Sequence, residues 1–239
     1  MTITTILLDL DDTLLTINMA KFVRAYIKGL ALTLADFAPL ERTSTALLKA
    51  TGAIVKNDDP DLTNEHVFFD AFLPHFNGSL EQIRPRLTDY FTAHYADLKQ
   101  YTRARPAAPQ LIRTLLAQDY KLVVATNPLY PKPAIDQRLA WAGVLDFPYR
   151  LVTTLENMHH CKPSPYYYQE ILQRINSRPD ETLMVGDDPH NDMAPARSLG
   201  CKTWWIPGGH AANGVVSADY QGSLAELLAW VKAGGLAAC

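Results

Sequence analysis

The chain has 239 residues, of which 48% are hydrophobic and 20% charged, so it can bury a sizeable core as one large domain or two smaller ones. A formal net charge of -3 excludes the strong basic field that binding to nucleic acid or to an anionic membrane surface requires. No apolar stretch is long enough to span a bilayer, and no long apolar segment precedes Asp9, so we expect an unprocessed, cytoplasmic protein.

The three cysteines, Cys161, Cys201 and Cys239, are odd in number and far apart in the chain. They form neither a disulfide framework nor a metal-ligand spacing, which favours a reducing compartment. We expect no nucleic-acid partner and no membrane partner, and a protein that is a monomer or a weak homodimer.

The apolar run Ile6–Leu8 leads directly into Asp9–Thr13, where three carboxylates and a hydroxyl follow. Continuous apolar runs are typical of parallel strands that helices cover on both faces, so this run predicts a buried strand. Asp9 and Asp11 would then lie at its carboxyl end, where open α/β sheets bind ligands. Crowded carboxylates repel one another, and a hard cation such as Mg²⁺ would relieve the repulsion. The alternative is a polar turn that caps the next helix.

Residues 18–101 change from short apolar runs to helical spacing, with Phe22, Tyr26, Leu30 and Leu34 on one helix face. The same spacing predicts further helices at about 41–50, 64–76 and 79–99. Ser79 and Gln82 predict a capping box at the start of the last one, and turn residues predict a loop over 51–62. Four antiparallel helices would form a small bundle.

After Pro106 the pattern alternates between strands and helices, which predicts βα units and a parallel sheet. Strands are expected at 122–125, 149–153, 183–185 and 202–206. Helices are expected at 109–118, 133–142, 165–175, 193–199 and 224–232.

The first strand must join this later sheet, so the helical residues form an insertion. We expect a core domain of residues 1–16 and 102–239 and a helical cap domain of residues 17–101, with hinges near 14–17 and 100–106. The predicted fold class is α/β, a Rossmann-like parallel sheet with helices on both faces, plus an inserted helical-bundle cap.

Three later groups of polar or charged residues also lie next to predicted strands or helices, as Asp9 and Asp11 do. Thr126 and Asn127 follow an apolar strand and could form an anion cradle, or simply cap a helix. Lys162 precedes two prolines, and a lone lysine in such a place is normally solvated. Asp187 and Asp192 follow another strand, where an acidic helix start is the plain alternative.

Taken jointly, these groups have the order Asp-x-Asp-x-Thr, Thr-Asn, Lys-Pro and Gly-Asp-x-x-x-x-Asp. This order resembles the haloacid dehalogenase-like hydrolase superfamily, whose four motifs match Asp9/Asp11/Thr13, Thr126, Lys162 and Asp187/Asp192. The resemblance covers nearly the whole chain and includes a helical cap inserted after the first motif. Asp12 stands where many members have Gly, a change that we expect to be tolerated because this residue need not touch the ligand.

The resemblance implies that Asp9 is a nucleophile that forms a phosphoaspartyl intermediate, while Asp11 protonates the leaving oxygen and then activates water. It also implies a Mg²⁺ cofactor. The Asp9 carboxylate, the Asp11 backbone carbonyl and Asp187 would hold the ion, with Asp192 or Asp188 in support.

Substrate binding would fall to Thr13, Thr126, Asn127 and Lys162. In the resemblance, Thr126 and Lys162 neutralise the transferring phosphoryl oxygens and Thr13 braces the nucleophile loop. An anionic carboxylate that attacks an anionic phosphate needs positive charge beside it, which the metal and the lysine would supply.

The implied function is a Mg²⁺-dependent phosphatase for a small phosphorylated metabolite, with the cap excluding water and contacting the organic part of the substrate. A phosphomutase keeps the same motifs and stays open as an alternative. A haloacid dehalogenase needs no acid two positions after the nucleophile, so Asp11 counts against it, and the four filled catalytic positions count against a binding module without turnover. Lys21, Arg24 and Tyr26 of the cap could recognise substrate, although a solvated charged face is the simpler interpretation.

Overall fold

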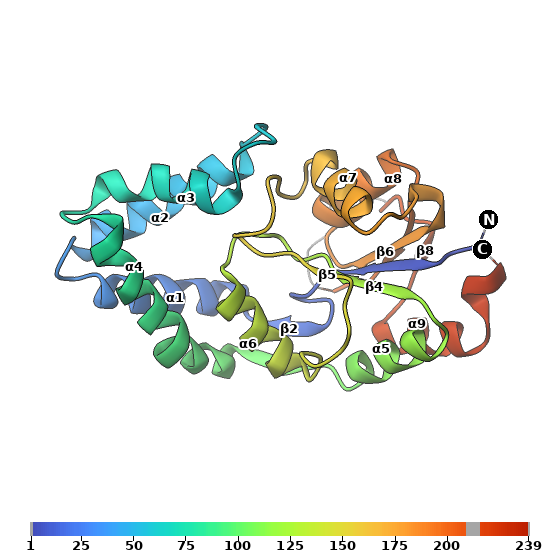
Figure 1. Cartoon of the computed structure of the whole chain (residues 1–239). Coiled ribbons are helices and arrows are strands. Elements are labelled where there is room, and N and C mark those ends of the chain that lie inside the picture. The colour runs from blue at the N-terminus through green and yellow to red at the C-terminus, as the bar shows by residue number, and fades with distance from the viewer. Residues whose placement is uncertain (1, 209–215, 239) are drawn as a thin grey trace.

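The computed structural model describes residues 2–208 and 216–238 of the chain, so Cys239 lies outside the described residues. A six-stranded sheet forms its centre, with the order β5-β4-β1-β6-β7-β8 and every neighbouring pair parallel (Figure 1). The strands are β1 (Thr5–Leu8), β4 (Lys121–Val124), β5 (Leu151–Val152), β6 (Thr182–Gly186), β7 (Lys202–Trp205) and β8 (Tyr220–Gln221). The predicted parallel sheet is confirmed, and the short edge strand β8 adds to it.

β1 is a central strand of this sheet, with β4 on one side and β6 on the other. All four residues of β1 are buried, as expected for a strand that helices cover on both faces. Because the three strands run in the same direction, the segments that follow them meet at one edge of the sheet. Asp9, Thr126 and Asp187 belong to these three segments.

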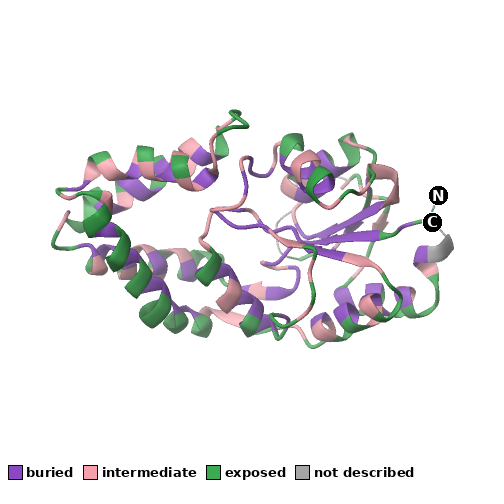
Figure 2. Cartoon of the chain, viewed as in Figure 1, coloured by how far each residue is buried: buried purple, intermediate pink, exposed green. Residues whose placement is uncertain are grey.

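Helices cover both faces of the sheet (Figure 1). α5 (Ala107–Ala117) and α9 (Leu224–Lys232) lie on one face, and α7 (Pro165–Arg174) and α8 (Ala194–Ser198) lie on the other. Side chains of β1 alternate between the two sides, so Ile6 joins the core around α5 while Leu7 packs with Tyr167 of α7. The central strands are buried along their length (Figure 2), which confirms the α/β class.

The insert consists of helices at the opposite end of the molecule from the sheet (Figure 1). They are α1 (Met19–Thr33), α2 (Leu40–Val55), α3 (Asn64–Phe72) and α4 (Leu80–Asp89). The predicted apolar face of α1 is confirmed, since Phe22, Tyr26, Leu30 and Leu34 are all buried. In residues 2–208 and 216–238, no helix is both long and apolar enough to cross a membrane.

Two predicted boundaries in the insert are wrong. α2 continues to Val55, because its last turns bury Ile54, and the predicted loop begins only after that residue. α4 starts with the predicted capping box but ends at Asp89, and a π-helical turn and a 3₁₀ segment carry the chain to Tyr101. In that turn the N–H of Tyr95 donates to the carbonyl of Tyr90, five residues earlier, which lets both aromatic rings be buried.

Helices of the core mostly follow the prediction. α6 (Lys132–Ala142) ends at Gly143, whose φ of 73° is the left-handed conformation that glycine adopts without a Cβ penalty. α8 spans Ala194–Ser198, one residue shorter than predicted at each end, and residues 189–193 form a π-helical turn before it. That turn carries Asp192 back toward the end of β6, as the site requires.

The two predicted hinges are strands that pair with each other. β2 (Leu15–Ile17) and β3 (Thr102–Ala104) form an antiparallel ladder, in which Ile17 lies opposite Thr102. The insert therefore leaves and rejoins the core through adjacent strands. Its assignment as a separate domain of residues 17–101 stays a prediction.

Candidate active site

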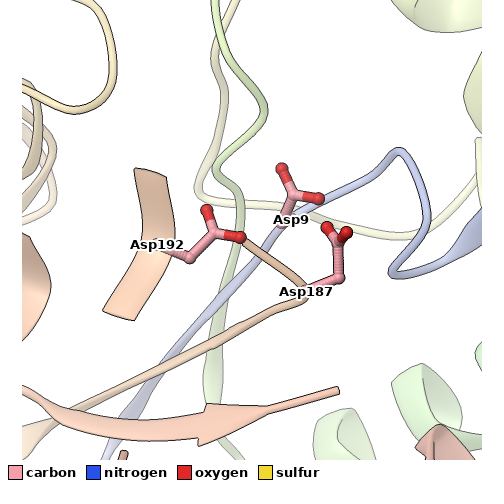
Figure 3. A group of neighbouring side chains, drawn as sticks. All are labelled: Asp9, Asp187 and Asp192. Carbon is pink, nitrogen blue, oxygen red and sulfur yellow. The ribbon is translucent and has the colours of Figure 1, made fainter. Parts of the chain in front are cut away.

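Three buried carboxylates meet at the carboxyl edge of the sheet (Figure 3). Asp9 follows β1, Asp187 follows the adjacent strand β6, and Asp192 comes from the π-helical turn after it. One oxygen from each carboxylate lies within 4.8 Å of the others. The exposed fractions of Asp9, Asp187 and Asp192 are 7%, 2% and 1%, so the charges are held away from solvent.

Asp192 reaches the cluster because β6 ends in a glycine. A Cβ atom on Gly186 would lie 2.2 Å from Oδ2 of Asp192, so any side chain there would displace this carboxylate. The N–H of Asp188 donates to the same oxygen at 3.0 Å. The carboxylate of Asp188 itself accepts the N–H groups of His190 and Asn191 and caps the turn, so Asp192 rather than Asp188 joins the cluster.

Lys162 is the buried cation of this site, not a solvated lysine. Its Nζ donates to Oδ1 of Asp9 at 2.8 Å and to Oδ1 of Asp192 at 2.7 Å. Burial alone would lower the pKa of Lys162, but the carboxylates of Asp192 and Asp9 outweigh burial and raise this pKa well above its ordinary value. The lysine therefore stays charged throughout the neutral range.

The cluster fits a hard divalent cation. Its donors are carboxylate oxygens only, which suits Mg²⁺ better than zinc or copper. Three ionised carboxylates beside one ammonium group also leave an excess of negative charge for a cation to balance. Burial raises the pKa of Asp192, although the charge of Lys162 opposes this shift. Keeping all three carboxylates ionised is therefore unfavourable unless further positive charge is present.

The remaining predicted residues lie around the cluster. The hydroxyl of Thr13 lies 3.5 Å from Oδ1 of Asp187, which links the loop after β1 to the loop after β6. Asn127 accepts the backbone N–H of Lys162 at 3.2 Å and so orients the segment that carries the lysine. Thr126 is buried beside them, and its carbonyl accepts the hydroxyl of Tyr167 at 2.8 Å.

Asp12 has the left-handed conformation that favours glycine, with a φ of 56°. Aspartate tolerates this region better than most residues because its short side chain can bond locally. Here Oδ1 of Asp12 accepts the N–H of Ile17 at 3.1 Å, and its carbonyl accepts Arg105 at 2.6 Å. These local bonds show how aspartate is accommodated here, while its tolerance in the function of the site stays a prediction.

Asp11 has a partner that the sequence did not predict. Its Oδ2 accepts a hydrogen bond from Nη1 of Arg138 on α6, whose side chain is only 1% exposed and lies 4.3 Å from the ring centre of Tyr130. Burial raises the pKa of Asp11, and Arg138 opposes that shift. A charged residue in register with the apolar Ile135 and Ala142 of α6 is the sequence signal that could have indicated Arg138.

A cavity of about 340 Å³ opens above the carboxylates. The core contributes its polar floor, which includes Asp9, Asp11, Thr126, Asn127, Lys162, Asp187 and Asp192. Helices α1 and α2 of the insert contribute the opposite wall. Of the three cap residues predicted as candidates for recognition, Tyr26 lines the cavity, whereas Lys21 and Arg24 are exposed outside its lining.

Comparisons with known proteins show what the whole chain is similar to. A family model described as haloacid dehalogenase-like hydrolase matches residues 3–200. Pyrophosphatase PpaX from Anoxybacillus flavithermus is 26% identical over 212 residues, which cover 87% of each chain.

Two solved structures match nearly the whole fold. A HAD phosphatase from Thermococcus onnurineus has a TM-score of 0.60 at 23% identity, over 98% of this chain and 99% of that one. A 2-haloacid dehalogenase from Pseudomonas syringae pv. Tomato has a TM-score of 0.60 at 21% identity, over 97% and 99%. Since both match equally well, fold alone does not distinguish the two activities, and the side chains of the site must do so.

Proposed function

This chain belongs to the haloacid dehalogenase-like hydrolase family, and from that premise we propose that it is a Mg²⁺-dependent phosphatase of small phosphate monoesters. One observation carries the proposal. A second acid, Asp11, opens onto the same cavity as Asp9, beside the buried ammonium group of Lys162. Phosphate transfer needs a nucleophile, an acid for the leaving oxygen and fixed positive charge, and these three residues offer one of each.

In the proposed reaction, Asp9 attacks phosphorus and forms a phosphoaspartyl group as the bond from phosphorus to the leaving oxygen breaks. Asp11 gives its proton to that oxygen, so the product leaves as an alcohol. Asp11 then takes a proton from water, whose oxygen attacks the phosphoaspartyl group, releasing inorganic phosphate and restoring the Asp9 carboxylate.

Positive charge makes the first step feasible. Lys162, held by Asp9 and Asp192, offers an ammonium group to the transferring oxygens, with Thr126 beside it. The carboxylates of Asp9, Asp187 and Asp192 would hold Mg²⁺ together with the backbone carbonyl of Asp11, and the ion would supply the charge that an anionic nucleophile and an anionic phosphate require.

Phosphate release from p-nitrophenyl phosphate, with and without Mg²⁺, tests this function. Asp9→Asn keeps the volume of the side chain but removes the nucleophile, so turnover should be lost while the circular dichroism spectrum stays the same. An Asp9→Asn protein that remains active would contradict the mechanism. If a phosphorylated isomer forms from a sugar phosphate and no phosphate is released, the protein is a phosphomutase and not a phosphatase.

A further inference from the structure

We propose that the monoesters hydrolysed at this site carry an apolar organic group, which the wall formed by α1 and α2 receives. This inference rests on the proposed phosphatase function and adds the class of substrate to it. Its basis is the uneven distribution of polarity in the cavity. Apart from Leu129 and the ring of Tyr130, the core side holds carboxylates, hydroxyls, amides and an ammonium group, whereas the cap side is predominantly hydrocarbon.

Five aliphatic residues form most of the cap wall. Met19, Val23 and Ile27 come from α1, and Leu47 and Leu48 come from α2. Tyr26 and Thr51 add the only hydroxyl groups among the described residues of this wall. A polyhydroxylated group bound here would lose hydrogen bonds to water and find few replacements, which costs about 1–3 kcal/mol for each unpaired polar group.

This wall differs from an ordinary hydrophobic core because two of its large apolar side chains are exposed to solvent. The side chains of Met19 and Leu48 are 37% and 67% exposed, although the packing of a helical bundle would place large apolar groups inside. Apolar side chains at the mouth of a cavity gain free energy when a ligand removes their surface from water. They therefore favour an apolar group that enters the cavity behind the phosphate.

Charge argues against a second phosphate. Lys162 is the only cation among the described residues that line the cavity, and it lies on the core side with Asp9 and Asp192. A terminal phosphate against Val23 or Leu47 would lose its hydration without gaining a counter-charge there. Although a relative is named a pyrophosphatase, the cap wall of this chain suits a monoester better than pyrophosphate or a bisphosphate.

The volume of about 340 Å³ lies near the lower end for small-molecule sites, so the apolar group must be compact. A series of n-alkyl phosphates, from propyl to hexyl, tests this with the holoenzyme in Mg²⁺. Their leaving alkoxides are chemically alike, so differences in kcat/KM report binding of the chain. We expect kcat/KM to rise about twofold to fourfold per methylene until the cavity is filled, and to exceed that for glycerol phosphate and pyrophosphate.

Two exposed leucines give a matched pair of variants. Leu48 is 67% exposed and lines the cavity, whereas Leu32 is 68% exposed and lies on α1 outside its lining. Leu48→Ser should flatten the dependence on chain length, and Leu32→Ser should leave it as steep as in the parent protein. Because both side chains are at the surface, neither substitution threatens the fold.

The possible outcomes distinguish a failure of the apolar substrate class from a failure of the proposed phosphatase function. A flat series with clear turnover, a preference for pyrophosphate, or a slope that Leu48→Ser leaves unchanged would overturn the apolar substrate class and leave the phosphatase intact. No phosphate from any ester, with Mg²⁺ present and the fold intact, would overturn the proposed function itself.

Discussion

Asp11, which exchanges protons in the proposed reaction, forms an ion pair with the buried Arg138. Nε and Nη2 of Arg138 and Oδ1 of Asp11 have no hydrogen-bond partner within the described part of the chain. Taking a guanidinium group out of water with only one of its three nitrogens bonded is unfavourable for stability. Its placement is better explained by what it does for Asp11, whose carboxylate it holds in one orientation at the edge of the cavity.

Replacing Arg138 should therefore slow the reaction selectively, more for a substrate with a poor leaving group than for one with a good leaving group. We expect Arg138→Met to lower the rate with an alkyl phosphate by about 10²-fold, because a misplaced acid cannot protonate a poor leaving group. The loss with an aryl phosphate should be much smaller, since a phenolate leaves without help. Parallel kinetics on hexyl and p-nitrophenyl phosphate measure both losses.

Two further variants make this result specific to orientation. Arg138→Lys keeps the charge and should recover part of the alkyl activity, while Arg113→Met, on the exposed side of α5, should change neither rate. Equal losses on both substrates for Arg138→Met, at a temperature where the variant is folded, would mean that Arg138 serves the fold and not Asp11.

A second prediction concerns Gly186, the glycine that ends β6. A Cβ atom there overlaps the carboxylate of Asp192, so Gly186→Ala should push Asp192 from the cluster and weaken Mg²⁺ binding about 10- to 100-fold. The Mg²⁺ concentration that raises the melting temperature measures this without turnover. Gly52→Ala on α2, where a Cβ would meet nothing within 4 Å, is the control. An unchanged Mg²⁺ midpoint would show that Asp192 is not needed for the ion.

Among the elements, α3 is one of the places besides the β2–β3 ladder where the insert contacts the core. At the start of α3 the N–H of Asn64 donates to the carbonyl of Met158 at 2.8 Å, and the N–H of Glu65 donates to Leu155 at 3.0 Å. The side chain of Asn64 is fully buried there. Since the loop that accepts these bonds leads directly to Lys162, the position of α3 is coupled to the position of this lysine.

This contact changes where motion of the cap should appear. The sequence alone placed it at residues 14–17 and 100–106, but these segments form paired strands, so their amides should exchange slowly in every state. Alanine keeps these backbone bonds but removes the buried side-chain amide, whose Nδ2 donates to the carbonyl of His160 at 3.4 Å. We therefore expect Asn64→Ala to speed hydrogen exchange at the start of α3 and in residues 155–161, while β2 and β3 stay protected. Asn77→Ala, an exposed asparagine of the same insert, should leave both regions unchanged. Faster exchange in β2 and β3 would restore the hinge interpretation.

The elements also show what sequence could and could not predict. Asp9 and Asp187 were predictable because each follows a well-marked strand, and a parallel sheet brings such ends together. Lys162 was predictable only through the family resemblance, since a lone lysine before a helix is normally solvated. Arg138 was not, because its partner lies 127 residues away and only the packing of α6 brings the two together. The π-helical turn at 90–94 was hidden for a similar reason, since buried aromatic rings override helical periodicity there.

The two described cysteines of the molecule lie in different places, Cys161 at the contact between the insert and the core and Cys201 within the core. Cys161 and Cys201 are 2% and 3% exposed, and burial raises the pKa of Cys201 to about 12 and that of Cys161 well above its usual range. A raised pKa lowers the thiolate fraction, so at pH 8 both should react about 10³-fold more slowly with iodoacetamide than in the unfolded chain.

Cys161 should become reactive at a lower temperature than Cys201. Nδ2 of Asn64, from the insert, lies 3.5 Å from the sulfur of Cys161, so separation of the insert from the core would expose this thiol. Cys201 is buried within the core alone. Mass spectrometry of the two peptides after brief labelling at each temperature tests this order. Simultaneous labelling would show that insert and core unfold as one cooperative unit.

The central position of β1 also affects how the protein is made. β1 leaves the ribosome well before its neighbours β4 and β6, which begin only at Lys121 and Thr182. At about 5–20 residues per second, synthesis leaves β1 without its second partner for about 9–35 s, with an apolar edge open to other chains. A nascent chain halted before Thr182 would therefore be prone to aggregate, and it would carry Asp9 without the strand that brings Asp187 beside it.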